Sequence, residues 1–130
     1  MLSAAILCLS NALGSATVAV PAFTLAWTHS IEKIRWEEDW RVADDALRLE
    51  TARVRGSGAG MEPPPDAVLQ HGVWEWHPGR TESMLRLTRS SFTPDYVFCT
   101  QGERGGQDCR PLGDLLPSDG GVTEVFPCPR

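Results

Sequence analysis

Residues 23–42 constrain the fold more than any other stretch, because apolar and polar positions alternate on both sides of a short polar break (FTLAWTHSIEKIRWEEDWRV). Alternation with a period of two is typical of β-strands that bury one face. One face of the first arm contains Phe23, Leu25, Trp27 and His29. One face of the second arm contains Ile34, Trp36, Glu38, Trp40 and Val42, and its opposite face contains Arg35, Glu37, Asp39 and Arg41. The stretch therefore predicts an antiparallel β-hairpin with one buried face.

Two polar residues fall on these otherwise apolar faces, His29 in the first arm and Glu38 in the second. If both faces point into one core, the register that we expect places Trp27 opposite Glu38. The same register places His29 opposite Trp36 and diagonal to Glu38, within side-chain reach. Since two desolvated polar groups are tolerated when they bond to each other, we predict that His29 and Glu38 are in contact.

Twelve glycines and ten prolines separate short runs rich in Val, Leu, Thr and Trp, a punctuation that favours an all-β fold. Because 130 residues is the size of one domain, we predict a single β domain over residues 1–130. We expect an antiparallel β-sandwich or flattened barrel of about seven to nine strands. Further strands are expected at 46–55, 73–76, 84–89, 96–99 and 122–126, with a helical turn or a loop at 112–116. In the strand at 46–55, Leu47, Leu49 and Thr51 are expected to face the core.

Residues 1–22 allow two interpretations. They are apolar and rich in small residues, as in a signal peptide, but no Lys or Arg precedes the apolar run, and Asn11 and Gly14 interrupt it. The alternative is a first strand around Ala5 to Leu9, a turn at Asn11 to Ser15, and a long second strand from Thr17 to Ser30 that bends at Pro21. We favour the strands.

The four cysteines are Cys8, Cys99, Cys109 and Cys128. Structural zinc sites usually take close pairs such as Cys-x-x-Cys, and the sequence contains none, so we do not expect one. Cys99 and Cys109 flank the Gly-rich segment TQGERGGQD, which looks like a loop between strands. Closing that loop leaves Cys8 to pair with Cys128. Two disulfides would indicate an oxidising compartment, and free buried thiols in a cytosolic protein are the alternative.

The charges argue against nucleic acid and anionic membranes as direct partners. Twelve Lys and Arg residues oppose 17 Asp and Glu residues, a net charge of −5, and the positive charges are scattered. The segment GSGAGMEPPPDA at 56–67 has the glycines of a phosphate-binding loop. Such loops open a helix, which the prolines at 63–65 forbid, and the P-loop lysine is absent. We therefore predict a glycine-rich loop followed by an extended stretch.

Three segments resemble the signature of the DUF1850 family: THSIEK at 28–33, EEDW at 37–40 and GSGAGMEPPPDA at 56–67. The resemblance extends from about Phe23 to Cys109. Members of this bacterial family of unknown function are typically small β-rich proteins, often encoded beside TAXI-type TRAP transporters, which import solutes with a periplasmic binding protein. The resemblance implies an accessory role in solute uptake, with a component of such a transporter or its solute as partner. It also implies an exported or periplasmic location, with a cytoplasmic one as the alternative, and membrane association only through the partner.

The residues allow two classes of function. The first is a non-catalytic module that binds a ligand or partner with the loops at one end of the sandwich, where function usually resides. The residues expected there are His29, Ser30, Glu32, Lys33, Glu38, Gly58, Gly60 and Met61. The second is a small enzyme in which His29 and Glu38 act as acid and base or as metal ligands. Further groups in that enzyme would come from Glu37, His71 or His77. We favour the module, without a cofactor.

Each histidine also has a structural interpretation. His29 would be a core histidine that bonds the Glu38 carboxylate, since an unpaired buried carboxylate is costly. His71 and His77 lie among Gly and Pro, so we expect both to be solvated in turns. A serine hydrolase is disfavoured, because His29 and Ser30 are neighbours on one strand and point to opposite faces.

Overall fold

The structure, a computed structural model, describes residues 5–28, 34–56, 63–102 and 104–129. These residues form twelve strands in two antiparallel sheets, with one 3-10 turn, η1 (Leu112–Asp114). The predicted all-β sandwich is confirmed, with open sheets that do not close into a barrel. The strands are β1 (Ile6–Asn11), β2 (Gly14–Ala19), β3 (Ala22–Thr28), β4 (Arg35–Val42), β5 (Leu47–Arg55), β6 (Val68–Gln70), β7 (Val73–Trp76), β8 (Thr81–Glu82), β9 (Leu85–Thr88), β10 (Val97–Gln101), β11 (Gln107–Pro111) and β12 (Val122–Pro127). They outnumber the expected seven to nine, since several are very short.

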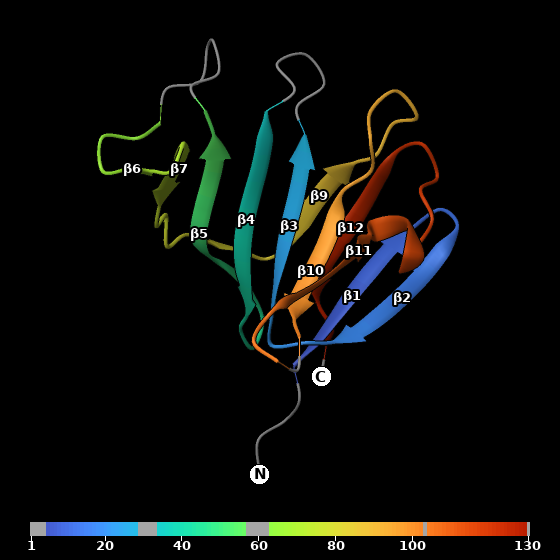
Figure 1. Cartoon of the computed structure of the whole chain (residues 1–130). Helices are drawn as coiled ribbons and strands as arrows, with labels where there is room; N and C mark the ends of the chain where they lie inside the picture. Colours follow the sequence, from blue (N-terminus) through green and yellow to red (C-terminus); the bar gives the residue numbers. More distant parts are fainter. Residues whose placement is uncertain (1–4, 29–33, 57–62, 103, 130) are drawn as a thin grey trace.

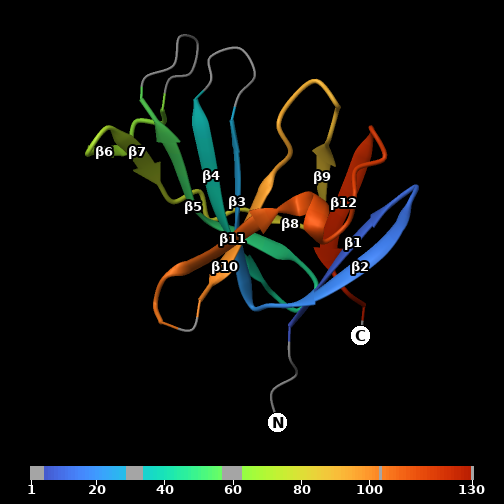
Figure 2. The ribbon, with the colours of Figure 1, turned by 45° about the vertical axis from the view of Figure 1, so that its right-hand side comes forward.

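A small sheet and a large sheet make up the sandwich (Figures 1 and 2). The small sheet has the order β2-β1-β12-β9, and the large one has the order β11-β10-β3-β4-β5-β7-β6, with β8 paired to β5. The predicted long strand from Thr17 to Ser30 is wrong, because β2 and β3 belong to different sheets. Pro21 lies in the connection between β2 and β3. Its lack of a backbone N–H removes no hydrogen bond from either sheet there. No helix in the described ranges is long and apolar enough to span a membrane.

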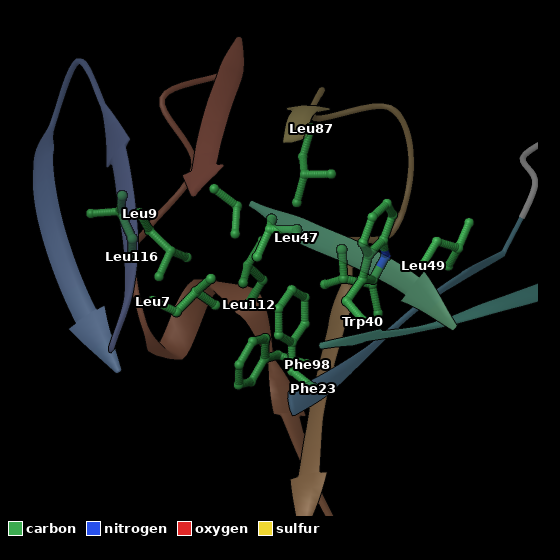
Figure 3. Close-up of a cluster of buried hydrophobic side chains, with 12 residues drawn as sticks. Leu7, Leu9, Phe23, Trp40, Leu47, Leu49, Leu87, Phe98, Leu112 and Leu116 are labelled. Atoms are coloured by element: carbon green, nitrogen blue, oxygen red, sulfur yellow. The ribbon is translucent and has the colours of Figure 1, made fainter. Parts of the chain in front are cut away.

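Residues of both sheets and of the segment around η1 form one hydrophobic core (Figure 3). Its buried members are Leu7, Leu9, Phe23, Leu25, Trp40, Leu47, Leu49, Leu87, Phe98, Leu112, Leu116 and Val125. Leu7 and Leu9 occupy alternate positions of β1, so both point inward, and neither is accessible to solvent. The N-terminal segment therefore supplies part of the core.

β3 and β4 form the predicted hairpin at the centre of the large sheet. The expected register is wrong by two residues: Trp27 pairs with Trp36, and Glu38 pairs with Leu25. A shift of two residues leaves every side chain on its own face, so the apolar pattern does not distinguish the two registers. The predicted alternation of faces therefore holds, although the predicted register does not.

A β-bulge interrupts the pairing of β4 with β5. Asp39 pairs with Thr51. The next residue, Trp40, pairs with Leu49, which leaves Glu50 as the extra residue of β5. The buried positions of β5 are Leu47, Leu49, Ala52 and Val54. The inner face thus changes phase at the bulge, and the prediction that Thr51 continues it is wrong.

Both predicted disulfides are present, and no described cysteine is free. Cys99 and Cys109 lie directly opposite each other in β10 and β11, with Cα atoms 4.1 Å apart. Cys8 of β1 bonds to Cys128, which follows β12, across a Cα separation of 5.1 Å. One bridge closes a hairpin, and the other joins the first strand to the last. Two disulfides are typical of proteins that fold in an oxidising compartment.

Candidate functional site

Glu38 is the one predicted binding residue that the structure describes. Glu38 lies in β4, and the other predicted residues lie outside the described ranges: His29, Ser30, Glu32, Lys33, Gly58, Gly60 and Met61. The predicted contact between His29 and Glu38 therefore lies outside the described residues too. β3 ends at Thr28, β4 begins at Arg35 and β5 ends at Arg55, and these strand ends lie side by side (Figure 1).

Four aromatic side chains gather on the inner face at this end of the sheet. Trp27 of β3 stacks with Trp36 of β4, with ring centroids 6.2 Å apart. Trp36 also meets Trp76 of β7 in an edge-on contact at 6.3 Å. Tyr96, just before β10, lies 5.8 Å from Trp27. We call Trp27, Trp36, Trp76 and Tyr96 the aromatic cluster.

The aromatic cluster is partly exposed, unlike the large side chains at the other end of the same face. There, Phe23, Trp40 and Leu49 retain at most 3% of their accessible surface. The core of the sandwich thus covers the inner face of the large sheet incompletely. Aromatic surface is left over beside the strand ends that lead to the predicted loops.

Glu38 lies on this inner face between Leu25 of β3 and Ala52 of β5. Its carboxylate accepts a hydrogen bond from the Trp40 indole, with 3.2 Å between Nε1 and Oε1. Burial raises the pKa of Glu38, and the Trp40 bond and the Arg80 charge oppose this rise without reversing it. Glu38 is therefore a partly desolvated carboxylate beside the aromatic cluster.

The outer face of the large sheet carries a network of ion pairs centred on Arg53. Arg53 donates to both carboxylate oxygens of Asp39, at 2.7 and 2.8 Å, and to Glu37 at 3.0 Å. Arg35 donates to Glu37 at 2.8 Å, and Thr24 donates to Asp39 at 2.7 Å. Burial alone would raise the pKa values of Glu37 and Asp39, but these bonds and the arginine charges hold both below their usual range. The network is internally satisfied, which suits a structural role.

A polar cavity of about 450 Å³ lies between this outer face and the β10–β11 hairpin. Its lining includes Thr24, Asp39, Thr51, Gln101 and Gln107. The charged groups of the lining are paired, Arg41 with Glu50 at 2.6 Å and Asp39 with Arg53. The cavity is large enough for a small molecule and offers it hydrogen bonds but no free charge.

Comparison with protein families matches residues 23–105 to a family described as "Domain of unknown function (DUF1850)". The chain belongs to the DUF1850 family. The DUF1850 match contains the whole aromatic cluster, Glu38 and Arg53, whereas β1, β2 and β12 lie outside it. No curated protein and no solved structure matches the chain.

The sequence pattern of this DUF1850 chain did not indicate a buried charged cluster around Arg89. Arg89 is 2% exposed and donates to both oxygens of Asp95, at 2.8 and 2.9 Å, and to Thr123 at 3.0 Å. Burial alone would raise the pKa of Asp95, but the Arg89 bonds and charge lower it. Arginine is seldom fully buried unless paired, so alternation gives no signal for it. The cluster ties the segment after β9 to β12, a strand outside the DUF1850 match, and serves the fold of the sandwich.

Histidines and metal ligands do not converge in the described part of the DUF1850 domain. Its described residues contain no group of three or more His, Cys, Asp and Glu side chains that could hold a metal ion. Both His71 and His77 are exposed, as predicted. His71 lies in the turn between β6 and β7, whereas His77 follows β7 and its Nδ1 lies 3.3 Å from Thr51 Oγ1 and 3.2 Å from the Glu50 carbonyl oxygen. What the described residues assemble is a partly exposed aromatic surface with one desolvated carboxylate.

Proposed function

We propose that this protein is a non-catalytic binding module that works beside a TRAP-type solute transporter in the bacterial periplasm. One observation carries the proposal: aromatic side chains from neighbouring strands remain partly exposed at the end of the sheet where the predicted loops begin. Aromatic side chains supply much of the binding energy of protein interfaces and ligand sites. The resemblance to the DUF1850 family supplies the class of partner, a TAXI-type transporter component or its solute. The two disulfides favour an oxidising compartment such as the periplasm.

The proposal is tested by capture of partners from native membranes and periplasm with the full chain as bait. We expect recovery of a TAXI-type TRAP subunit by the wild-type protein. The variants Trp36→Ala and Trp76→Ala each remove part of the aromatic cluster, so both should reduce recovery about tenfold or more. Phe92→Ala is the matched control, because Phe92 is 93% exposed and lies outside the cluster.

Two outcomes would contradict the proposal: no transporter subunit recovered by the wild-type protein, or equal recovery by all four proteins. Because large-to-small changes destabilise, the melting temperature of each variant is measured first. Trp36→Phe keeps an aromatic ring and serves as a milder variant if Trp36→Ala does not fold.

A further inference from the structure

Glu38 differs from every other glutamate in the described strands. Each of the others has an arginine nitrogen within 4 Å: Glu37 with Arg35 at 2.8 Å, Glu50 with Arg41 at 2.6 Å, Glu75 with Arg53 at 3.6 Å, Glu82 with Arg80 at 3.1 Å and Glu124 with Arg86 at 3.2 Å. Within the described part of the chain, Glu38 makes no ion pair and a single hydrogen bond, from Trp40. It is also more buried than Glu37, its neighbour on the opposite face.

The residues around Glu38 make an unpaired carboxylate unfavourable at this position. Leu25 and Ala52, the residues on either side of Glu38 in the sheet, are 1% and 3% exposed. A carboxylate beside apolar groups loses hydration, and this loss is offset when a cation pairs with it. Arg80 lies close enough to influence Glu38, but its guanidinium already pairs with Glu82. The site thus has a negative charge without a dedicated positive partner among the described residues.

The aromatic cluster lies on the same face as this charge and supplies surfaces that also attract cations. Trp36 precedes Glu38 by two positions on the same face, and its ring contacts Trp27 of the adjacent strand β3 and Trp76 of β7, which lies beyond β5. Tryptophan rings bind ammonium groups through their negative faces, as in the aromatic cages that recognise methylated amines. Small Ala52 separates Glu38 from Trp76 in the sheet, so no bulky side chain stands between them.

We infer that Glu38 and the aromatic cluster form a recognition site for a small organic cation that carries an alkylammonium group. The carboxylate supplies the charge, and the indole rings supply cation–π contacts and apolar contact for the alkyl portion. This inference rests on the proposed binding function and adds the chemical class of the ligand. It concerns the inner face only and is independent of the polar cavity on the outer face.

The test is isothermal titration of the full chain with butylammonium and with tetramethylammonium, and with 1-butanol as the neutral probe. We expect saturable binding of at least one cation and much weaker binding of the alcohol. Glu38→Gln keeps the shape of the side chain and an oxygen that accepts the Trp40 bond, but removes the charge, so cation affinity should fall by roughly tenfold or more. Trp36→Leu should weaken the cation by a similar factor.

Glu75→Gln is the matched control, because it removes one negative charge from the exposed opposite face of the same sheet. It should leave cation affinity unchanged. Two results would overturn the inference. The first is that the wild-type protein binds neither cation at a probe concentration of about 10 mM. The second is that Glu38→Gln binds the cations as tightly as the wild-type protein does. Loss of partner capture in the tryptophan variants, together with a cation affinity that Glu38→Gln leaves unchanged, would overturn the cation site and leave the proposed function standing.

Discussion

Three consecutive carboxylates of β4 show how strongly the face of a strand governs the chemistry of a side chain. Glu37 and Asp39 point outward into the Arg53 network, which lowers their pKa values. Glu38, between them in sequence, points inward, and burial raises its pKa. A glutamate of this strand therefore has a lowered pKa on the outer face of the sheet and a raised pKa on the inner face.

Glu38→Gln should stabilise the protein at neutral pH. A carboxyl whose pKa is higher in the folded state binds its proton more tightly there, so its charge costs stability above that pKa. We expect the variant to be more stable than wild type by about 1 kcal/mol at pH 7 to 8. The difference should shrink as the pH falls through the raised pKa of the folded state toward the ordinary glutamate pKa of about 4.3, because the wild-type carboxyl becomes protonated over this range. Urea unfolding across this pH range measures it, and a variant that is less stable at every pH would contradict the argument.

Arg53→Met should have the opposite pH dependence. Glu37 and Asp39 have lowered pKa values, so their stabilising contribution is present above the ordinary carboxyl pKa and is lost as the pH falls through the folded-state value. We expect a loss of about 1 to 2 kcal/mol at pH 7, given partial solvent screening, and a smaller loss at pH 3. Arg41→Met is the control, because its ion pair with Glu50 is exposed and should contribute less than about 1 kcal/mol.

Side-chain alternation in the sequence was sufficient to predict the residues of each face of β4, and loop closure was sufficient to predict both cysteine pairs. Alternation was not sufficient to predict the burial of Arg89. That burial depends on Asp95 and Thr123, which lie next to Arg89 only in the folded chain. Alternation placed two members of the aromatic cluster, Trp27 and Trp36, on faces that point into the core, whereas the cluster is partly exposed. Its partial exposure depends on how far the small sheet extends over the large one, which no local pattern specifies.

Two features of the large sheet explain where predictions at the level of strands failed. The predicted and the observed β3–β4 registers differ by two residues and bury the same faces of both strands. The periodicity of the sequence therefore does not distinguish them. The bulge at Glu50 changes the phase of β5, and the sequence does carry its signal. Leu47 and Leu49 occupy odd positions, whereas Ala52 and Val54 occupy even ones. A change of apolar phase within one strand is thus a usable indicator of a bulge.

Deleting Glu50 should be tolerated better than deleting Arg48 from the same strand. Without Glu50, Leu49 and Ala52 remain on the inner face with Thr51 between them on the outer face. Without Arg48, either Leu47 or Leu49 must turn outward, at a cost of about 2 to 5 kcal/mol. Thermal unfolding compares the two deletions, and equal or greater loss from the Glu50 deletion would contradict a removable bulge.

At the scale of the whole molecule, the two disulfides join very different lengths of chain. Cys99 and Cys109 are separated by 10 positions, and Cys8 and Cys128 by 120. In the chain-entropy description, the longer bridge restricts the unfolded state more. Replacing Cys8 and Cys128 with Ser should therefore cost about 2 kcal/mol more than replacing Cys99 and Cys109. Urea unfolding of both double variants measures the order, and the reverse order would contradict this account.

The pairing of β1 with β12 also has a kinetic consequence. Strands that are distant in sequence must close a long loop before they gain any contact, which slows folding. During synthesis or passage through a narrow channel from the N-terminus, Leu7 and Leu9 would emerge early and wait for the last strand to shield them. The small sheet would then be completed last, and until that moment the chain would expose an unpaired strand edge that invites aggregation or the binding of a chaperone.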